Sequence, residues 1–140
     1  MHYITTTDLS AIIRQPVLNE ISENTPANLT EASASAKSEV EDYLNTLYDT
    51  VQIFNRTGDD RHRSVVRVMC ELTLYYAHKR INPHNIPELR RQGYQDAINW
   101  LKDVRDGRMA PRGLPRIENE DGILQSTNRF NTDQRLTEGW

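Results

Sequence analysis

The sequence predicts an all-α fold, a small bundle of about four helices with a short extended segment between helices two and three and a long extended C-terminal arm. Three observations predict it. Apolar residues recur at helical spacing along most of the chain before Gly107. Prolines and glycines fall between these stretches. After Gly107 they follow one another so closely that no regular helix fits.

A short first helix is predicted over residues 8–15. Thr6 or Thr7 can cap it, and Pro16 is expected to end it. Its apolar residues share one face: Leu9, Ile12 and Ile13. A helix this short needs neighbours, so we expect it to pack against the rest of the bundle. A polar linker over residues 19–28 is expected to follow.

The second helix is predicted over residues 29–48, because its apolar residues keep an i, i+3, i+4 rhythm. They are Ala32, Ala36, Val40, Tyr43, Leu44 and Leu47. Residues 49–60 break that rhythm, with a VQIF run followed by Gly58 and two aspartates. This pattern predicts a short strand or a packed loop rather than a helix.

The third helix is predicted from Asp60 to Tyr76 or Arg80. It is apolar almost all round, which is typical of a helix at the centre of a bundle. A turn around Pro83 ends it, and Pro87 at a first helical position opens a fourth helix. That helix is predicted to run to Asp106, with Gly107 as its C-terminal stop.

Two parts follow from this pattern, a helical domain over residues 1–110 and an extended arm over residues 111–140. Isolated apolar residues along the arm are candidate anchors for a partner: Ile117, Ile123, Leu124, Phe130, Leu136 and Trp140. One interpretation is that the arm wraps its own domain or is a loose tail. The other is that its anchors dock into pockets on other subunits, as interface hot spots do.

Composition excludes several classes of protein. No run of about 18 apolar residues exists, so no membrane span is expected. The N-terminus has an acid at Asp8 and no long apolar stretch, so it does not resemble a secretory signal, and we expect the product to stay in the cytoplasm where it is made. Cys70 is the only cysteine, which excludes a disulfide within the chain.

The sequence lacks the common motifs of enzyme active sites and cofactor-binding sites. It has no phosphate-binding loop, dinucleotide fingerprint, nucleophile elbow or HExxH pair. His78 and His84 flank the turn around Pro83 and are expected to be loop or core histidines, and Cys70 is expected to be a small core residue. We therefore expect no enzyme activity, no catalytic residues, no cofactor and no metal.

The net charge of −3 hides a separation of charge along the chain. The first 60 residues carry 3 basic and 10 acidic side chains, residues 61–116 carry 12 and 5, and residues 117–140 carry 2 and 5. Such a chain can bind nucleic acid with its middle, or pair an acidic face with the basic face of the next subunit, unless both are merely solvated helix faces. The candidate basic face, for a subunit or for DNA, consists of Arg61, Arg63, Arg67, Arg90 and Arg91.

Several packing positions resemble the Mu-type tailed-phage head-tail connector family. Three features carry the resemblance. The first is the run Val65 to Tyr76, followed after a loop by Tyr94-x-x-Ala-Ile-x-x-Leu-x-x-Val-x-x-Gly-Arg. The second is the start Tyr3 with Thr5-Thr-Thr-Asp-Leu, and the third is Glu41-Asp-Tyr-Leu. The resemblance covers roughly residues 1–110, and the long arm lies beyond it.

This resemblance implies a structural virion protein, a helical adaptor that forms a closed ring of about 12 subunits beneath the portal. It implies a place in the neck of the particle, assembly in the host cytoplasm, and partners that are the portal protein and a tail or second neck protein. Genomic DNA would pass through the ring with only transient, nonspecific contact. The alternative from the residues alone is a nucleic-acid-binding packaging accessory or regulatory protein that uses the basic middle helices.

Overall fold

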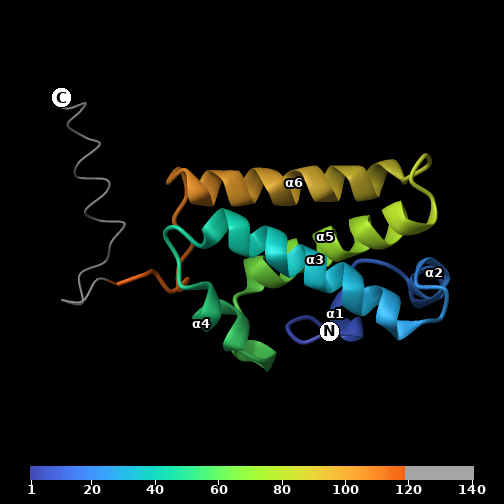
Figure 1. Cartoon of the computed structure of the whole chain (residues 1–140), viewed down its shortest axis with the longest axis horizontal. Helices are drawn as coiled ribbons and strands as arrows, with labels where there is room; N and C mark the ends of the chain where they lie inside the picture. The colour runs from blue at the N-terminus through green and yellow to red at the C-terminus, as the bar shows by residue number, and fades with distance from the viewer. Residues whose placement is uncertain (119–140) are drawn as a thin grey trace.

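The computed structural model describes residues 1–118, and within them the fold is all-α, as the sequence predicts (Figure 1). The α-helices are α1 (Thr6–Ser10), α2 (Gln15–Ile21), α3 (Pro26–Leu44), α4 (Thr50–Asn55), α5 (Arg63–Ile81) and α6 (Glu88–Arg105). A short 3-10 helix, η1 (Gly58–Asp60), precedes α5. No helix in this part of the chain is long and apolar enough to cross a membrane.

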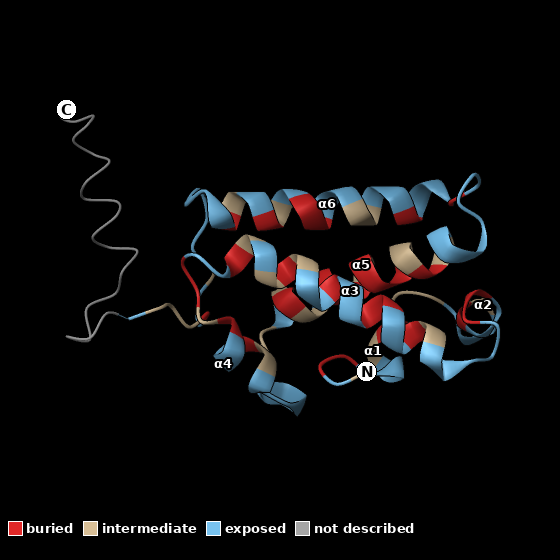
Figure 2. Ribbon diagram, in the orientation of Figure 1, coloured by how far each residue is buried: buried red, intermediate tan, exposed pale blue. Residues whose placement is uncertain are grey.

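Helix α5 lies at the centre and contacts α3, α6, α1 and α2. Its buried residues occupy nearly every side of the helix: Val65, Val68, Met69, Cys70, Leu72, Thr73, Leu74 and Ala77. Figure 2 shows the buried residues of α6 on the side that faces α3 and α5, and exposed residues on its outer side. The prediction that the most apolar helix is central is therefore confirmed.

Helix α3 packs along α5 through a face that begins at buried Leu29 and continues with small residues. Ala32, Ser33 and Ala36 are buried there, and larger apolar residues follow at Val40 and Leu44. The helix begins at Pro26, three residues earlier than predicted, because a proline in the first turn lacks only an N–H that would have no helical partner. It ends at Leu44, and Leu47 and Tyr48 are buried in the turn that follows.

The predicted single helix over residues 8–15 is wrong, since two short helices occupy this region. Thr5 and Asp8 form a reciprocal capping box that starts α1, and this helix ends at Ser10. Pro16 lies in the first turn of α2 and so begins a helix rather than ending one. Part of the predicted polar linker is therefore helical.

The predicted extended segment over residues 49–60 is also wrong. The Asp49 side chain accepts a hydrogen bond from the backbone N–H of Gln52 at 3.2 Å, which caps α4. Ile53 of this helix is buried in the core. The apolar run that suggested a strand is therefore part of the short helix α4, which packs against the core.

The chain after α6 returns to the body. Gly107 adopts a positive φ of 81°, as a helix C-terminal stop requires. Leu114 is then buried in the core, the Asp49 N–H donates to the carbonyl oxygen of Pro115 at 2.9 Å, and the Ile117 N–H donates to that of Leu47 at 3.1 Å. The first residues after position 110 therefore pack against the loop between α3 and α4.

Two truncations should separate this packed stretch from the rest of the arm. Removal of residues 112–140 should lower the free energy of unfolding by about 2 kcal/mol, because it exposes the pocket of Leu114. Removal of residues 119–140 should change it by less than about 0.5 kcal/mol. Urea denaturation followed by circular dichroism measures both. Equal stability of the two truncated chains would show that residues 112–118 add nothing to the fold.

Candidate functional site

A groove of about 460 Å³ lies between α1, η1 and the first half of α5. Its lining combines apolar side chains with charged ones: Asp8, Ala11, Ile12, Gly58, Asp59, Arg61, Arg63, Ser64, Val66, Arg67 and Cys70. Three of the five predicted basic residues therefore meet at one place. The groove is the candidate functional site.

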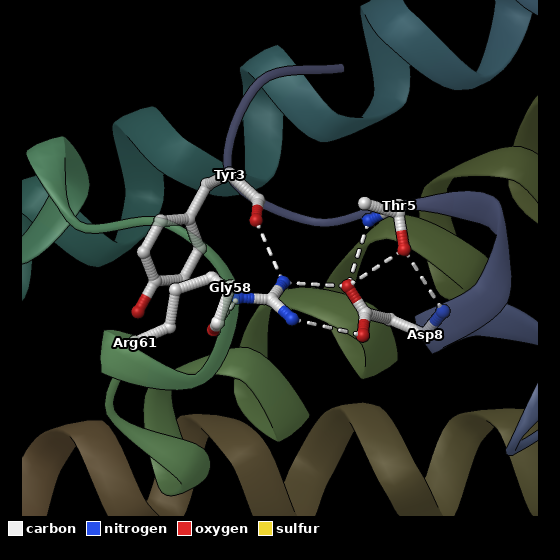
Figure 3. Close-up of polar contacts among 5 residues, drawn as sticks. All are labelled: Tyr3, Thr5, Asp8, Gly58 and Arg61. Carbon is white, nitrogen blue, oxygen red and sulfur yellow. Dashed lines mark hydrogen bonds and ion pairs between the residues drawn. The ribbon is translucent and has the colours of Figure 1, made fainter.

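Arg61 ties the N-terminal segment to η1 at the edge of this groove (Figure 3). Its Nη1 donates to Asp8 Oδ2 at 2.6 Å and to the carbonyl oxygen of Tyr3 at 2.8 Å. Its Nη2 donates to Asp8 Oδ1 at 3.2 Å, and its Nε donates to the carbonyl oxygen of Gly58 at 2.7 Å. The fork-shaped guanidinium therefore binds both carboxylate oxygens and two carbonyl groups from different segments.

Local structure places each partner of Arg61. The capping box holds Asp8, whose Oδ2 accepts from the Thr5 backbone N–H at 2.8 Å. Gly58 has a φ of +56°, a left-handed conformation that turns the chain into η1 and directs its carbonyl group toward Arg61. Tyr3 places its ring 5.9 Å from the Arg61 guanidinium and packs edge-on against Phe54 at 4.9 Å.

This pair fixes the charge states at the inner edge of the groove. The hydrogen bond from Arg61 lowers the pKa of Asp8 below its ordinary value of 3.8, and the same contact raises the pKa of Arg61. Burial raises the pKa of the Tyr3 hydroxyl. Asp8 is therefore an anion and Arg61 a cation at neutral pH, and their charges offset one another.

The lowered pKa of Asp8 predicts a pH dependence of stability. The folded chain favours the ionised carboxylate more strongly than the unfolded chain does. The contribution of Asp8 to the free energy of unfolding is therefore complete above the unfolded pKa of about 3.9. It is lost as the pH falls through the lower folded pKa. The stability difference between the natural chain and Asp8→Asn should therefore be constant from pH 7 to about pH 5 and shrink below about pH 4. Urea titrations at each pH measure it, with Asp96→Asn as the control for lost charge; a constant difference down to pH 2 would refute the linkage.

Arg63 and Arg67 differ from Arg61 in that they are exposed. They are one turn apart on α5 and both line the groove. Within residues 1–118, neither has a carboxylate at ion-pair distance. Half-buried Ile12 and Val66 supply an apolar wall beside these two cations.

The other two predicted basic residues lie away from the groove, at the start of α6. Arg90 is buried and donates to Glu71 Oε1 of α5 at 3.2 Å. Arg91 is exposed. The five arginines therefore do not form one continuous face, because three line the groove and two lie on α6.

Of the predicted arm anchors, the structure describes Ile117, which is half buried and hydrogen-bonded to Leu47 through its backbone. The others, Ile123, Leu124, Phe130, Leu136 and Trp140, lie outside the described residues.

Two residues considered above as possible chemical groups, Cys70 and His78, are buried or partly buried on α5. Cys70 is buried, and burial raises the pKa of its thiol to about 12. Burial, with the charge of Arg90, lowers the pKa of His78. No three His, Cys, Asp or Glu side chains among residues 1–118 are grouped as a metal ion would need.

A tyrosine cluster on α5 and α6 escaped the sequence analysis. Tyr75 and Tyr94 stack at 4.0 Å between ring centroids, and the Tyr76 hydroxyl donates a hydrogen bond to Glu39 of α3. Burial, followed by this carboxylate, raises the pKa of Tyr76. The adjacent tyrosines at 75 and 76 are the only signal in the sequence, and they read equally well as ordinary core positions.

Similarity to a known protein family extends over nearly all of the described part of the chain. A comparison with curated proteins finds no match to this chain. Residues 3–116, which include every helix that the structure describes and the groove, match the protein family described as Bacteriophage Mu, Gp36. The match covers most of the chain, and it agrees with the resemblance drawn from Tyr3, the third and fourth predicted helices and Gly107. The chain belongs to the bacteriophage Mu Gp36 family and is a phage protein.

Proposed function

We propose that this chain is a structural head-tail connector of a tailed phage. About 12 copies form a closed ring below the portal protein, join it to the tail or to a second neck protein, and enclose the channel through which DNA leaves the head. The subunit catalyses no reaction and needs no cofactor. It acts in the neck of the virion after assembly in the host cytoplasm.

The observation that carries this proposal is the separation of surface charge within a phage-family helical body. Exposed carboxylates lie on α2 and α3, at Glu20, Glu31 and Asp42. Exposed guanidinium groups lie on α5 and α6, at Arg63, Arg67 and Arg91. A ring of identical copies needs two unlike surfaces on each subunit, and surfaces of opposite charge meet that need.

The exposed pair Arg63 and Arg67 also favours a second candidate, a packaging accessory that binds DNA. That function predicts retention of DNA that falls steeply with salt and is weakened by Arg63→Ala or Arg67→Ala. DNA binding by the purified chain at low and high salt tests it. Absence of retention at low salt would exclude it.

Removing the gene from the phage separates the two candidates. A connector is needed for joining, so lysates should contain heads and complete tails that remain apart in electron micrographs. Loss of a packaging accessory should instead leave heads that never filled and DNA that was never cut to packaged length. Intact tailed particles from the deletion phage would contradict the connector proposal.

A further inference from the structure

The groove between α1, η1 and α5 presents two cations that have no carboxylate at ion-pair distance within residues 1–118, and these cations lie beside an apolar wall. Arg63 and Arg67 are exposed at its rim, and Ile12 and Val66 are half buried within it. Arg61 adds no free charge, because Asp8 neutralises it. An occupant that suits this lining carries carboxylates and apolar side chains close together.

The same lining disfavours a nucleic-acid backbone. A phosphate backbone offers no apolar group to the half-buried side chains of Ile12 and Val66. An acidic peptide with apolar residues can instead place its carboxylates on the two arginines and its apolar side chains on the wall.

This chain contains such a segment, which begins at its last described residue. Residues 118–124 read Glu-Asn-Glu-Asp-Gly-Ile-Leu, three carboxylates followed by two large apolar side chains. The chain is held at Arg116 by an antiparallel bridge to Tyr48, so the segment follows directly from the body. Six residues beyond Glu118 can span at most about 20 Å when fully extended.

We propose that residues 118–124 of one copy dock into the groove of a second copy, with Glu120 and Asp121 on Arg63 and Arg67 and with Ile123 and Leu124 against Ile12 and Val66. This inference rests on the proposed ring. It gives that ring a specific head-to-tail contact, because each subunit offers one segment and one groove. A head-to-tail contact of this kind produces a closed ring when the rotations from one subunit to the next add up to a full turn.

Disulfide capture tests this contact in the full chain. Ser64→Cys places a thiol in the groove and Gly122→Cys places one in the segment, and neither removes an arginine, a carboxylate or an apolar anchor. Mild oxidation should produce a ladder of linked chains on a non-reducing gel. Ala11→Cys, also at the groove, replaces Ser64→Cys if circular dichroism shows that the latter variant does not fold.

Two controls define the background of the capture. Gln92→Cys with Gly122→Cys puts the first thiol at an exposed position of α6 outside the groove, and it should link chains at least about tenfold less. Gly122→Cys alone should stop at dimers, because buried Cys70 offers no second reactive thiol.

Charge reversal tests the chemistry of recognition. Arg63→Glu with Arg67→Glu should reduce linking at least about tenfold, and adding Glu120→Arg with Asp121→Arg to the same chain should restore it. Lys79→Glu with Lys102→Glu, an equal charge change at exposed positions outside the groove, should leave linking unchanged.

Three results would overturn the inference: a disulfide formed only within one chain, linking no stronger than the α6 control, or linking insensitive to charge reversal. Native mass measurement of the same samples with the portal separates the two proposals. If the samples form a ring but show no specific disulfide link, the docking contact alone is refuted. A chain that forms no ring refutes the connector function, and the docking contact with it.

Discussion

Arg61→Ala is expected to lower the free energy of unfolding by about 2 to 3 kcal/mol. The substitution removes every hydrogen bond by which the guanidinium joins the N-terminal segment to η1. It also leaves Asp8 charged and mostly buried, since the Asp8 side chain is only 17% exposed. That exposed fraction still admits some water, which is why the expected loss lies below that of a fully buried pair.

Urea denaturation of Arg61→Ala measures this loss, and two further variants make it specific. Arg63→Ala removes an exposed arginine two positions away and should change stability by less than about 0.5 kcal/mol. Arg61→Lys keeps the charge but cannot bind both carboxylate oxygens and two carbonyl groups, so it should recover less than half of the loss. If Arg61→Ala is as stable as Arg63→Ala, the network at η1 does not hold the N-terminal segment.

Glu71→Ala is expected to cost about 3 kcal/mol, because it leaves Arg90 buried without its carboxylate. The Arg90 side chain is only 8% exposed, and Glu71 Oε1 lies 3.2 Å from its Nη1. Gly93 makes room for this arrangement: a Cβ at that position would lie 2.3 Å from Glu71 Oε1. The pair therefore depends on a glycine one turn along α6.

The double variant Glu71→Leu with Arg90→Met is the matched control for this prediction. Replacing both charged groups by apolar ones of similar size should recover most of the stability, because no buried charge is left unpaired. Thermal denaturation of the single and double variants measures the recovery. If Glu71→Ala costs no more than Asp96→Ala, which removes an exposed carboxylate from α6, the buried pair contributes nothing to stability.

The three long helices could be predicted from the sequence because their patterns are long. Helix α5 is apolar nearly all round, and α6 carries one clear stripe that ends before Gly107. The short helices could not, because a few residues fit several structures. Pro16 can end one helix or begin another, and a single capping bond from Asp49 turns an apparent strand into α4.

The candidate site was predictable in its charges but not in its pairings. The sequence marks Arg61, Arg63 and Arg67 as basic residues near one another on a helix. It carries no sign that Asp8, 53 positions away, binds Arg61 and not the other two arginines. Long-range contacts of this kind depend on how α1 packs against α5, which the periodicity of neither helix records.

The resemblance to a Mu-type phage family rested on the same packing positions, and it is confirmed at the level of the family. Those positions determine how the helices pack, and they do not indicate an activity. The connector function that we propose rests on the surface of the helical body, where exposed carboxylates on α2 and α3 and exposed arginines on α5 and α6 offer two unlike surfaces.

Native mass spectrometry of the purified chain, alone and mixed with its portal protein, tests the connector function most directly. The proposed function predicts a closed ring of about 12 copies that binds the portal as one unit. A chain that remains monomeric and never associates with the portal would contradict it.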